Sequence, residues 1–151
     1  MTPIWGIDLG GTKIECAVIE SLETRKVLLR KRLPTEQEQG YEHILQQIKK
    51  LVETVTAEVG FRPDKIGFAT PGTLDPKTQT LKNSNTVCLN GMPLKADLEA
   101  ILGVSCELAN DANCFALAEA KWGAAHEAMP NAEVVWGIIL GTGVGGGVVI
   151  N

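Results

Sequence analysis

The sequence predicts a mixed α/β fold in which an open sheet carries helices on both faces. Three strand-like segments near the N-terminus follow one another through short turn signals, as in an antiparallel meander. Beyond residue 40, helical and strand-like segments alternate, which is typical of parallel strands linked by helices. A glycine-rich hairpin closes the sequence.

The first half of the chain carries the clearest signals. Strands are expected at Ile4–Asp8, Ile14–Glu20 and Val27–Leu33, because these runs are rich in apolar and β-branched residues. A helix is expected over Tyr41–Val59, where apolar residues recur at spacings of three and four. Gly60 follows where a C-terminal glycine is favoured.

The second half continues the alternation with shorter elements. The expected strands are Lys65–Ala69, Thr80–Asn83, Val104–Leu108, Val134–Leu140 and Gly147–Ile150. The expected helices are Pro93–Leu102 and Ala112–Trp122. Three tryptophans in or beside these elements are assigned to packing, and they are Trp5, Trp122 and Trp136.

Composition narrows the possible classes of protein. The 151 residues are 44% hydrophobic and 21% charged, which is typical of a globular domain. The net charge of −4 disfavours nucleic-acid binding. No apolar run is long enough for a membrane span, and no signal-peptide pattern is found. The four scattered cysteines form no CxxC pair, so no zinc site is expected and a reducing cytoplasm is favoured.

The first chemical motif is IWGIDLGGTK, in which a strand ends at Asp8 and turns on Gly10 and Gly11. One interpretation is a plain hairpin turn, since glycines permit positive φ. The other is a phosphate site, because backbone N–H groups without side chains in the way can surround an anion. Thr12 would add a hydroxyl and Lys13 a charge, while Asp8 could hold a hydrated Mg²⁺.

The second motif is the glycine loop Gly141–Gly147. It contains GxGxxG, but a strand-like segment follows it, so we reject a dinucleotide fingerprint, which needs a helix there. The loop could be a flexible hairpin turn. Together with the first motif it could also form a pair of clamps for one polyphosphate, each with a threonine among glycines.

Polar residues follow two further strands. Asn110 and Asp111 open a helix, where either would serve as an N-cap. An ionised Asp111 could instead take the proton of a substrate hydroxyl that attacks phosphorus. The segments around Gly72 and Thr73 and around Asn85 are either polar turns or a site for a polyol, since amides and hydroxyls both donate and accept hydrogen bonds.

Together these motifs resemble those of the ROK family (repressors, open reading frames, kinases) within the actin-like ATPase and sugar-kinase superfamily. DLGGTK and GTGVGGG are similar to the family's two phosphate motifs, ATPG to its sugar-closing loop, and NDAN to the segment with its catalytic aspartate. LKNSNTVCLNGMPLKADL is most similar to fructokinase and mannokinase members. NDANCFALAEA and GIILGTGVGGG equally resemble N-acetylglucosamine kinases, so the sugar stays open.

The resemblance implies a ribonuclease H-like lobe of an ATP- and Mg²⁺-dependent kinase for a hexose or N-acetylhexosamine. Asp111 would be the catalytic base, acting on the hydroxyl at C6, and Asp8 would approach Mg²⁺ through water. The implied sugar contacts are Gly72, Thr73, Asn85, Asn110 and Asp111. The implied phosphate contacts are Gly10, Gly11, Thr12, Lys13, Gly141, Thr142 and Gly143.

The resemblance also implies a domain division. Residues 1–133 would form the N-terminal lobe, and residues 134–151 a hairpin that starts, or bridges to, a second lobe. The family's zinc motif, a histidine with three clustered cysteines, is not in this sequence, so any zinc would belong to the full-length parent. A cytoplasmic homodimer is expected for that parent.

Three alternatives remain open. A sugar-responsive repressor of the same family would need a DNA-binding helix-turn-helix, usually ahead of the strand that begins at Ile4. A ribonuclease H-like nuclease would need a third carboxylate beside Asp8 and Asp111 to hold two metal ions. A non-catalytic sugar-binding lobe would tolerate asparagine in place of Asp111.

Overall fold

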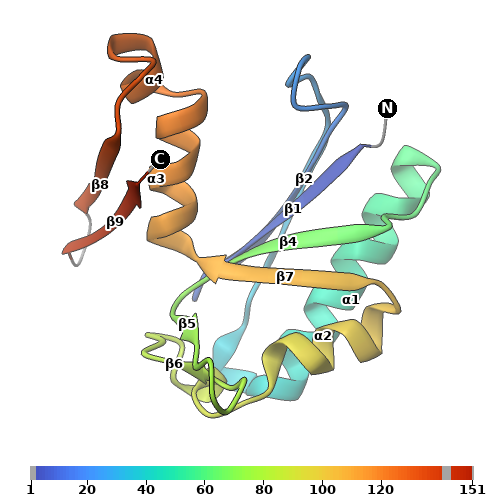
Figure 1. The fold of residues 1–151 in the computed structure, drawn as a ribbon. Helices are drawn as coiled ribbons and strands as arrows, with labels where there is room; N and C mark the ends of the chain where they lie inside the picture. Colours follow the sequence, from blue (N-terminus) through green and yellow to red (C-terminus); the bar gives the residue numbers. More distant parts are fainter. Residues whose placement is uncertain (1–2, 141–143, 151) are drawn as a thin grey trace. The chain divides into compact units, whose positions relative to one another are not determined.

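The computed structural model describes residues 3–140 and 144–150 (Figure 1). By its internal contacts the chain forms two compact units, Met1–Leu108 and Ala109–Asn151. Each unit is described by itself. The domain boundary expected between residues 133 and 134 stays a prediction.

A mixed five-stranded sheet forms the centre of the fold, as predicted. Its order is β3-β2-β1-β4-β7, with β1 antiparallel to β2, β2 antiparallel to β3, and β1 parallel to β4. The strands are β1 (Ile4–Leu9), β2 (Lys13–Ile19), β3 (Val27–Pro34), β4 (Lys65–Thr70) and β7 (Ser105–Asn110). All five strands were predicted, with ends displaced by one or two residues.

Two helices cover one face of this sheet in the first unit. Helix α1 (Tyr41–Val59) has the predicted bounds, and Gly60 ends it in the left-handed region at φ 84°. Helix α2 (Leu94–Leu102) lies beside α1 (Figure 1). Alternate residues of the strands join both helices in one core, whereas Gly6 and Asp8 on the opposite face are exposed. Helices were predicted on both faces of the sheet, and the helices of this unit cover one of them.

Two of the four cysteines, Cys16 and Cys106, belong to this core. Burial raises the pKa of the Cys16 thiol to about 12 and that of Cys106 to about 11, so both stay protonated at neutral pH. Cys88 and Cys114 are half-buried, and all four thiols are free.

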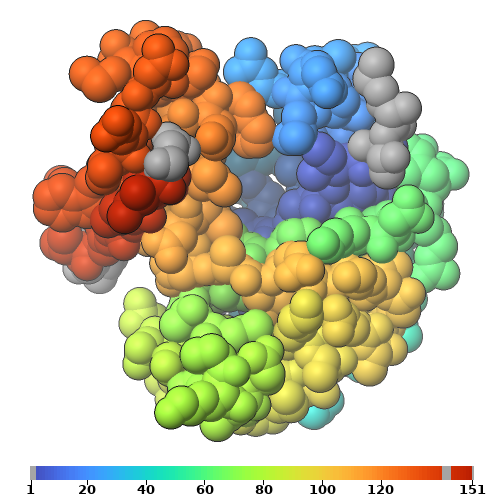
Figure 2. Space-filling model, viewed as in Figure 1, coloured from blue at the N-terminus to red at the C-terminus, as the bar shows by residue number. Residues whose placement is uncertain are grey.

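Several short elements were not predicted. Strands β5 (Thr73–Leu74) and β6 (Leu81–Lys82) form a small hairpin, of which the sequence indicated only the second strand. The other additions are two 3₁₀ turns, η1 (Gln37–Gln39) and η2 (Val87–Leu89), and helix α4 (Ala124–Ala128). In Figure 2 the segment from β5 through α2 forms one continuous surface, coloured green to gold.

The second unit consists of helix α3 (Asp111–Lys121), α4 and an antiparallel hairpin of β8 (Val134–Leu140) and β9 (Val144–Ile150). One face of the hairpin packs on α3, because the strand glycines permit a close approach there. A Cβ on Gly147 would collide with the carbonyl oxygen of Ala112, and one on Gly137 would lie 2.9 Å from the Phe115 ring.

The assignment of all three tryptophans to packing was wrong for two of them. Trp5 is buried, but Trp122 is 42% exposed and Trp136 is 68% exposed. In β8 the buried side belongs to Val135 and Gly137, so strand alternation turns Trp136 to the opposite face. None of the helices in the described segments has the length and apolarity needed to cross a membrane.

Candidate functional site

The turn between β1 and β2 carries the first glycine motif. It is closed by a hydrogen bond from the Gly10 N–H to the Lys13 carbonyl oxygen at 3.0 Å. Neither Gly10 nor Gly11 has a positive φ, so the turn does not need glycine for its dihedral angles. It needs glycine for space, because a Cβ on Gly10 would lie 2.9 Å from the Lys13 carbonyl oxygen. A Cβ on Gly11 would lie 3.2 Å from the Thr86 hydroxyl oxygen.

Thr35, which follows β3, holds this turn from one side. Its N–H donates to the Thr12 carbonyl at 2.9 Å, and its hydroxyl donates to the Gly10 carbonyl at 2.6 Å. Thr35 is fully buried, so both bonds are shielded from water. Within the described residues, the backbone N–H groups of Gly11 and Thr12 make no hydrogen bond. The turn therefore offers two adjacent donors, which is the chemistry of an anion-binding nest.

Asp8 lies one residue before the end of β1, on the exposed face. Its register partner in the parallel strand β4 is Ala69, so the ends of β1 and β4 bring Asp8 near the start of the segment Thr70–Thr73. No group of three or more histidine, cysteine, aspartate or glutamate side chains in the described chain could hold a metal ion. A single carboxylate is a ligand set that magnesium takes where phosphates and water supply the rest, so the magnesium role of Asp8 stays a prediction.

Gly72 begins the predicted sugar-side segment and has a backbone that only glycine adopts readily, with φ 129°. A Cβ there would lie 2.6 Å from the Lys82 carbonyl oxygen and 3.1 Å from the Ser84 nitrogen. Thr73 is exposed and pairs with Lys82 in the β5–β6 hairpin. This close approach fastens the ATPG segment to the segment that contains Asn85.

Hydrogen bonds lock the Asn85 segment into one arrangement. The Asn90 side chain accepts from the Ser84 N–H at 2.8 Å and donates to the Ser84 carbonyl at 3.0 Å. The Ser84 hydroxyl accepts from the Thr86 N–H at 3.1 Å. Ser84 and Thr86 are buried, and Asn85 between them is exposed. The amide of Asn90 is therefore used within the protein, whereas Asn85 faces outward.

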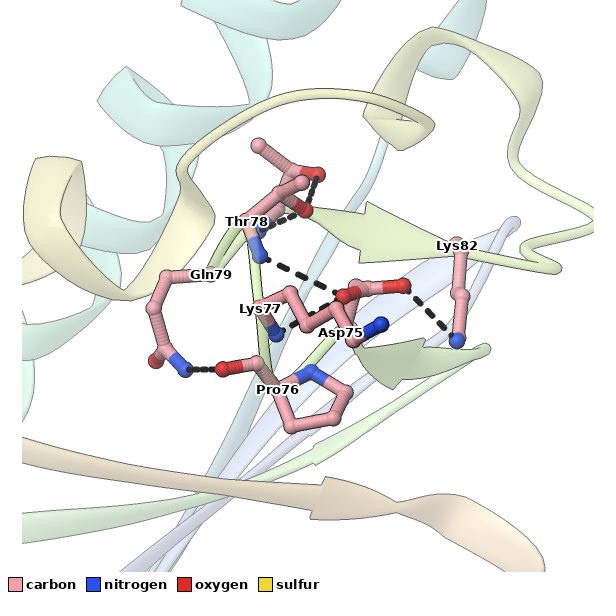
Figure 3. Close-up of polar contacts among 7 residues, drawn as sticks. Asp75, Pro76, Lys77, Thr78, Gln79 and Lys82 are labelled. Atoms are coloured by element: carbon pink, nitrogen blue, oxygen red, sulfur yellow. Dashed lines mark hydrogen bonds and ion pairs between the residues drawn. The ribbon is translucent and has the colours of Figure 1, made fainter.

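The turn from β5 to β6 is stabilised by Asp75 (Figure 3). One carboxylate oxygen accepts from the backbone N–H groups of Lys77 at 2.8 Å and Thr78 at 3.3 Å, and the other accepts from the Lys82 ammonium at 2.9 Å. The Lys82 hydrogen bond, followed by the two backbone donors, lowers the pKa of Asp75 to about 2. Asp75 thus supports the hairpin that carries Thr73.

The second unit contains the candidate base. Asn110 is the N-cap of α3, since its side-chain oxygen accepts from the N–H groups of Ala112 at 3.1 Å and Asn113 at 3.4 Å. Asp111 is the first residue of α3 and is exposed; its Oδ1 accepts from the Ala112 N–H at 2.8 Å. Its Oδ2 makes no hydrogen bond in the described part of the chain.

The second glycine motif is only partly described. Gly141, Thr142 and Gly143, which were predicted to contact phosphate, lie outside the described residues. Gly147, in β9, lies against Ala112 and Asn113 in the first turn of α3. The strand that contains the end of the motif therefore packs on the helix turn that carries Asp111.

Sequence reasoning missed Thr35, which is an ordinary polar residue after a strand. It singled out Thr86 and Asn90 only as parts of polar turns or of a polyol site, and it did not foresee that they hold neighbouring segments in place. Their importance follows from contacts between segments far apart in the chain, which no local pattern signals.

Comparisons with known proteins agree with these motifs. The model of the ROK family matches residues 4–151. An N-acetyl-D-glucosamine kinase of Salmonella newport (strain SL254) is 42% identical over 147 residues, which are 97% of this chain and 46% of that protein. The chain thus spans about half the length of this curated relative.

Two solved structures are similar over nearly the whole chain. A ROK family glucokinase from Streptomyces griseus, in complex with glucose and AMPPNP, is 30% identical with a TM-score of 0.81, covering 98% of this chain and 44% of that one. An inorganic polyphosphate/ATP-glucomannokinase from Arthrobacter sp. strain KM is 30% identical with a TM-score of 0.79, covering 100% of this chain and 62% of that one.

Proposed function

The chain belongs to the ROK family, and from this premise we propose that it is part of an ATP-dependent kinase for a hexose or N-acetylhexosamine. The relatives named above are kinases for N-acetylglucosamine, glucose, and glucose or mannose. They support a sugar as the acceptor without selecting one. The Salmonella protein is about twice as long as this chain, so the activity is proposed for the longer gene product.

One observation carries the proposal. In the first unit, the phosphate turn and the sugar-side segments lie side by side, since Gly11 lies against Thr86 and Gly72 lies against Ser84. The exposed Asn85 lies between Ser84 and Thr86 in the chain. A sugar held by Asn85 would therefore lie next to a phosphate held by the Gly11 turn. Phosphoryl transfer depends mainly on such positioning.

The proposed mechanism assigns a task to each group. The N–H groups of Gly11 and Thr12, the Thr12 hydroxyl and the Lys13 ammonium would donate to phosphate oxygens of ATP. Asp8 would contact the bound Mg²⁺ through water, and that ion would supply charge neutralisation at the phosphates. The remaining phosphate contacts proposed are Gly141, Thr142 and Gly143.

Asp111 is the proposed general base. Its Oδ1 is held by the Ala112 N–H, which leaves Oδ2 to accept the proton of the C6 hydroxyl as that oxygen attacks the γ-phosphorus. The other proposed sugar contacts are Gly72, Thr73, Asn85 and Asn110. We also propose that the full-length protein is a cytoplasmic homodimer and that any zinc site lies outside this chain.

A coupled ADP-release assay tests the function. The gene product, extended to its natural stop codon, is offered fructose, mannose, glucose, N-acetylglucosamine and N-acetylmannosamine. Asp111→Asn should lower kcat by about 10²-fold or more, with a smaller change in KM. Asp64→Asn is the matched control, since Asp64 is exposed and makes no hydrogen bond or ion pair with the described residues.

Each outcome separates the candidates. Turnover on one sugar that survives in Asp64→Asn and is lost in Asp111→Asn would establish the kinase and its substrate. An unchanged kcat in Asp111→Asn would remove that residue from its role. No turnover on any sugar, in a protein whose Tm still rises with one of them, would favour a sugar-responsive repressor or sensor.

A further inference from the structure

Two polar side chains beside Gly11 have no task in the mechanism above. A Cβ on Gly11 would lie 3.2 Å from the Thr86 hydroxyl oxygen, and 3.4 Å and 3.7 Å from the Nε2 and Oε1 atoms of Gln37. Gln37 begins the turn η1 and Thr86 lies directly before η2, so the two side chains come from separate segments of the first unit. They therefore converge on one side of the phosphate turn.

Both groups are available to a ligand. Thr86 is 2% exposed, yet its hydroxyl makes no hydrogen bond with the described residues. No fully buried side-chain nitrogen or oxygen in the described chain lacks a partner, so the Thr86 oxygen must open to the surface. The Gln37 side chain is exposed, and its amide likewise makes no hydrogen bond within those segments. Amide and hydroxyl are thus free to donate to a bound group.

The backbone that carries Gln37 is held in place from two sides. Glu36 directly before it has a left-handed conformation, with φ 53° and ψ 49°, which is strained for a residue other than glycine. The Glu36 carboxylate lies 2.6 Å from His43 Nε2 and 3.2 Å from Gln47 Nε2, so helix α1 holds the strained residue. On the other side, the Cys88 thiol donates to the Gln37 carbonyl oxygen at 3.9 Å. Strain that neighbouring groups maintain is typical of functional sites.

We propose that Gln37 and Thr86 donate hydrogen bonds to the phosphoryl group while it passes from ATP to the sugar. Thr86 follows the proposed sugar contact Asn85 in the chain, and Gly11 belongs to the proposed phosphate turn. Side chains that lie where these two segments meet stand where the phosphoryl group must cross between them. This rests on the proposed function in that the turn must hold ATP and the Asn85 segment the sugar.

The transfer step needs donors at this place. The sugar oxygen forms its bond to the γ-phosphorus, the bond to the bridging oxygen breaks with its electron pair on ADP, and the hydroxyl proton goes to Asp111. Meanwhile the charge is spread over the three equatorial oxygens of the phosphoryl group. Donors fixed on the protein stabilise this charge, in addition to the N–H groups of Gly11 and Thr12. The effect therefore falls on kcat and not on the binding of ATP or sugar.

Steady-state kinetics on the gene product extended to its natural stop codon test the assignment, with the sugar that the ADP-release assay identifies. Gln37→Ala should lower kcat by about tenfold, the effect of one hydrogen bond to a charged group, with KM for ATP and sugar nearly unchanged. Gln39→Ala is the matched control, because Gln39 lies in the same turn, is exposed, and its side chain makes no hydrogen bond with the described residues. Its kcat should equal that of the wild type.

A transition-state analogue supplies a second readout. ADP with aluminium fluoride and the sugar mimics the planar phosphoryl group in transfer, so Gln37→Ala should weaken its binding about tenfold in titration calorimetry. Binding of ADP alone should not change. An equal loss for ADP alone and for the analogue would assign Gln37 to the nucleotide and overturn the proposal. So would a raised KM for the sugar at an unchanged kcat.

Two substitutions of Thr86 separate its hydroxyl from its packing. Thr86→Ser keeps the hydroxyl and should retain most of kcat, whereas Thr86→Val keeps the shape and should lower kcat about tenfold. Equal kcat values in these two variants would remove Thr86 from the site.

The two proposals fail separately. No turnover on any sugar by the wild type would overturn both. Turnover that Gln37→Ala and Gln39→Ala retain equally would leave the kinase standing and overturn the role of Gln37. A kcat that falls in Gln37→Ala and is unchanged in Asp111→Asn would keep this inference and remove the proposed base.

Discussion

The hairpin of β1 and β2 and the hairpin of β8 and β9 both carry a glycine motif, but their surroundings differ. The turn Gly10–Lys13 is contacted by Thr35 and Thr86, which come from segments on two sides of it. The β8–β9 hairpin packs one face on α3, and its other face exposes large apolar side chains. Of the 17 exposed large hydrophobic residues in the segments that the structure describes, eight lie in these two strands.

This difference shows that a motif and its structural support are separate properties. The first turn is held by hydrogen bonds from within its own unit, so its free N–H donors are positioned before any ligand arrives. A two-stranded sheet is marginal by itself, and within the described residues α3 is the element that stabilises β8 and β9. The first hairpin should therefore be more sensitive to the loss of hydrogen bonds than to changes in packing. The second hairpin should be more sensitive to changes in packing.

The largest effect is expected where β9 packs on α3. Gly147→Ala would place a methyl group against the Ala112 carbonyl, and such overpacking costs about 2 kcal/mol. Gly145→Ala is the matched control, since nothing lies within 4 Å of a Cβ at that position of the same strand. Native-state hydrogen exchange of the α3 amides measures the loss. Equal protection in the two variants would mean that α3 does not depend on this contact.

A smaller effect is expected at the first turn. Thr35→Val keeps the shape of the buried side chain and removes its hydroxyl, which leaves the carbonyl of the half-buried Gly10 without that donor. We expect a loss of about 1–2 kcal/mol in the free energy of unfolding of the first unit, measured in urea, and weaker binding of tripolyphosphate.

Thr54→Val is the control for that change. The Thr54 hydroxyl also donates to a backbone carbonyl, that of Lys50, but on the exposed surface of α1. Loss of this bond should change stability by less than about 0.5 kcal/mol. If Thr35→Val behaved like Thr54→Val, the bond to Gly10 would not support the turn.

The sequence predicted best those features that local patterns control. Helix α1 was found with its bounds because its apolar period runs through 19 residues and Gly60 ends it. Strands β5 and β6 are two residues each, too short to show an alternating pattern, so only the second was foreseen. Helix α4 was missed because it has five residues. The start of α4 is held instead by Glu119 of α3, whose carboxylate accepts from the Ala124 N–H.

In the candidate site, too, local patterns predicted some features, and contacts between distant segments could not be predicted. Glycines followed by threonine indicated the first turn. Of the two reasons offered for the glycines, positive φ is not used, and the approach of a phosphate stays a prediction. The structure adds a reason that was not foreseen, which is the close approach of these glycines to the Lys13 carbonyl and the Thr86 hydroxyl. Asn110 was foreseen as a cap and is one. The hydrogen bonds of Thr35 to the turn, and the position of Arg32 opposite Glu15 in the sheet, depend on strand register and on contacts across the unit. No single stretch of sequence therefore contains them.

The smallest effect is expected in the turn between β5 and β6. This turn supports the proposed sugar-binding segment, so its stability can be compared with that of the two glycine hairpins. The pKa of Asp75 is lowered from its ordinary value of 3.8 to about 2, so its ionised form stabilises the folded turn. That contribution is fully present above pH 4 and is lost as the pH falls toward 2. The protection factors of the Lys77 and Thr78 amides, which compare the measured exchange with the intrinsic rate at each pH, should therefore fall over this interval in the wild type.

In Asp75→Asn the same amides should already be less protected at pH 7 than in the wild type. Between pH 4 and pH 2 their protection should then change no more than that of other amides, whereas Asp64→Asn should behave like the wild type. Asparagine keeps an acceptor for the two backbone N–H groups but loses the charge that pairs with Lys82, so the effect stays within the turn. If the protection of these amides in the wild type did not change with acid, the ion pair between Asp75 and Lys82 would not stabilise the turn. The sugar side would then be held by the Gly72 contact and the Asn90 hydrogen bonds alone, which are uncharged like those of the first turn.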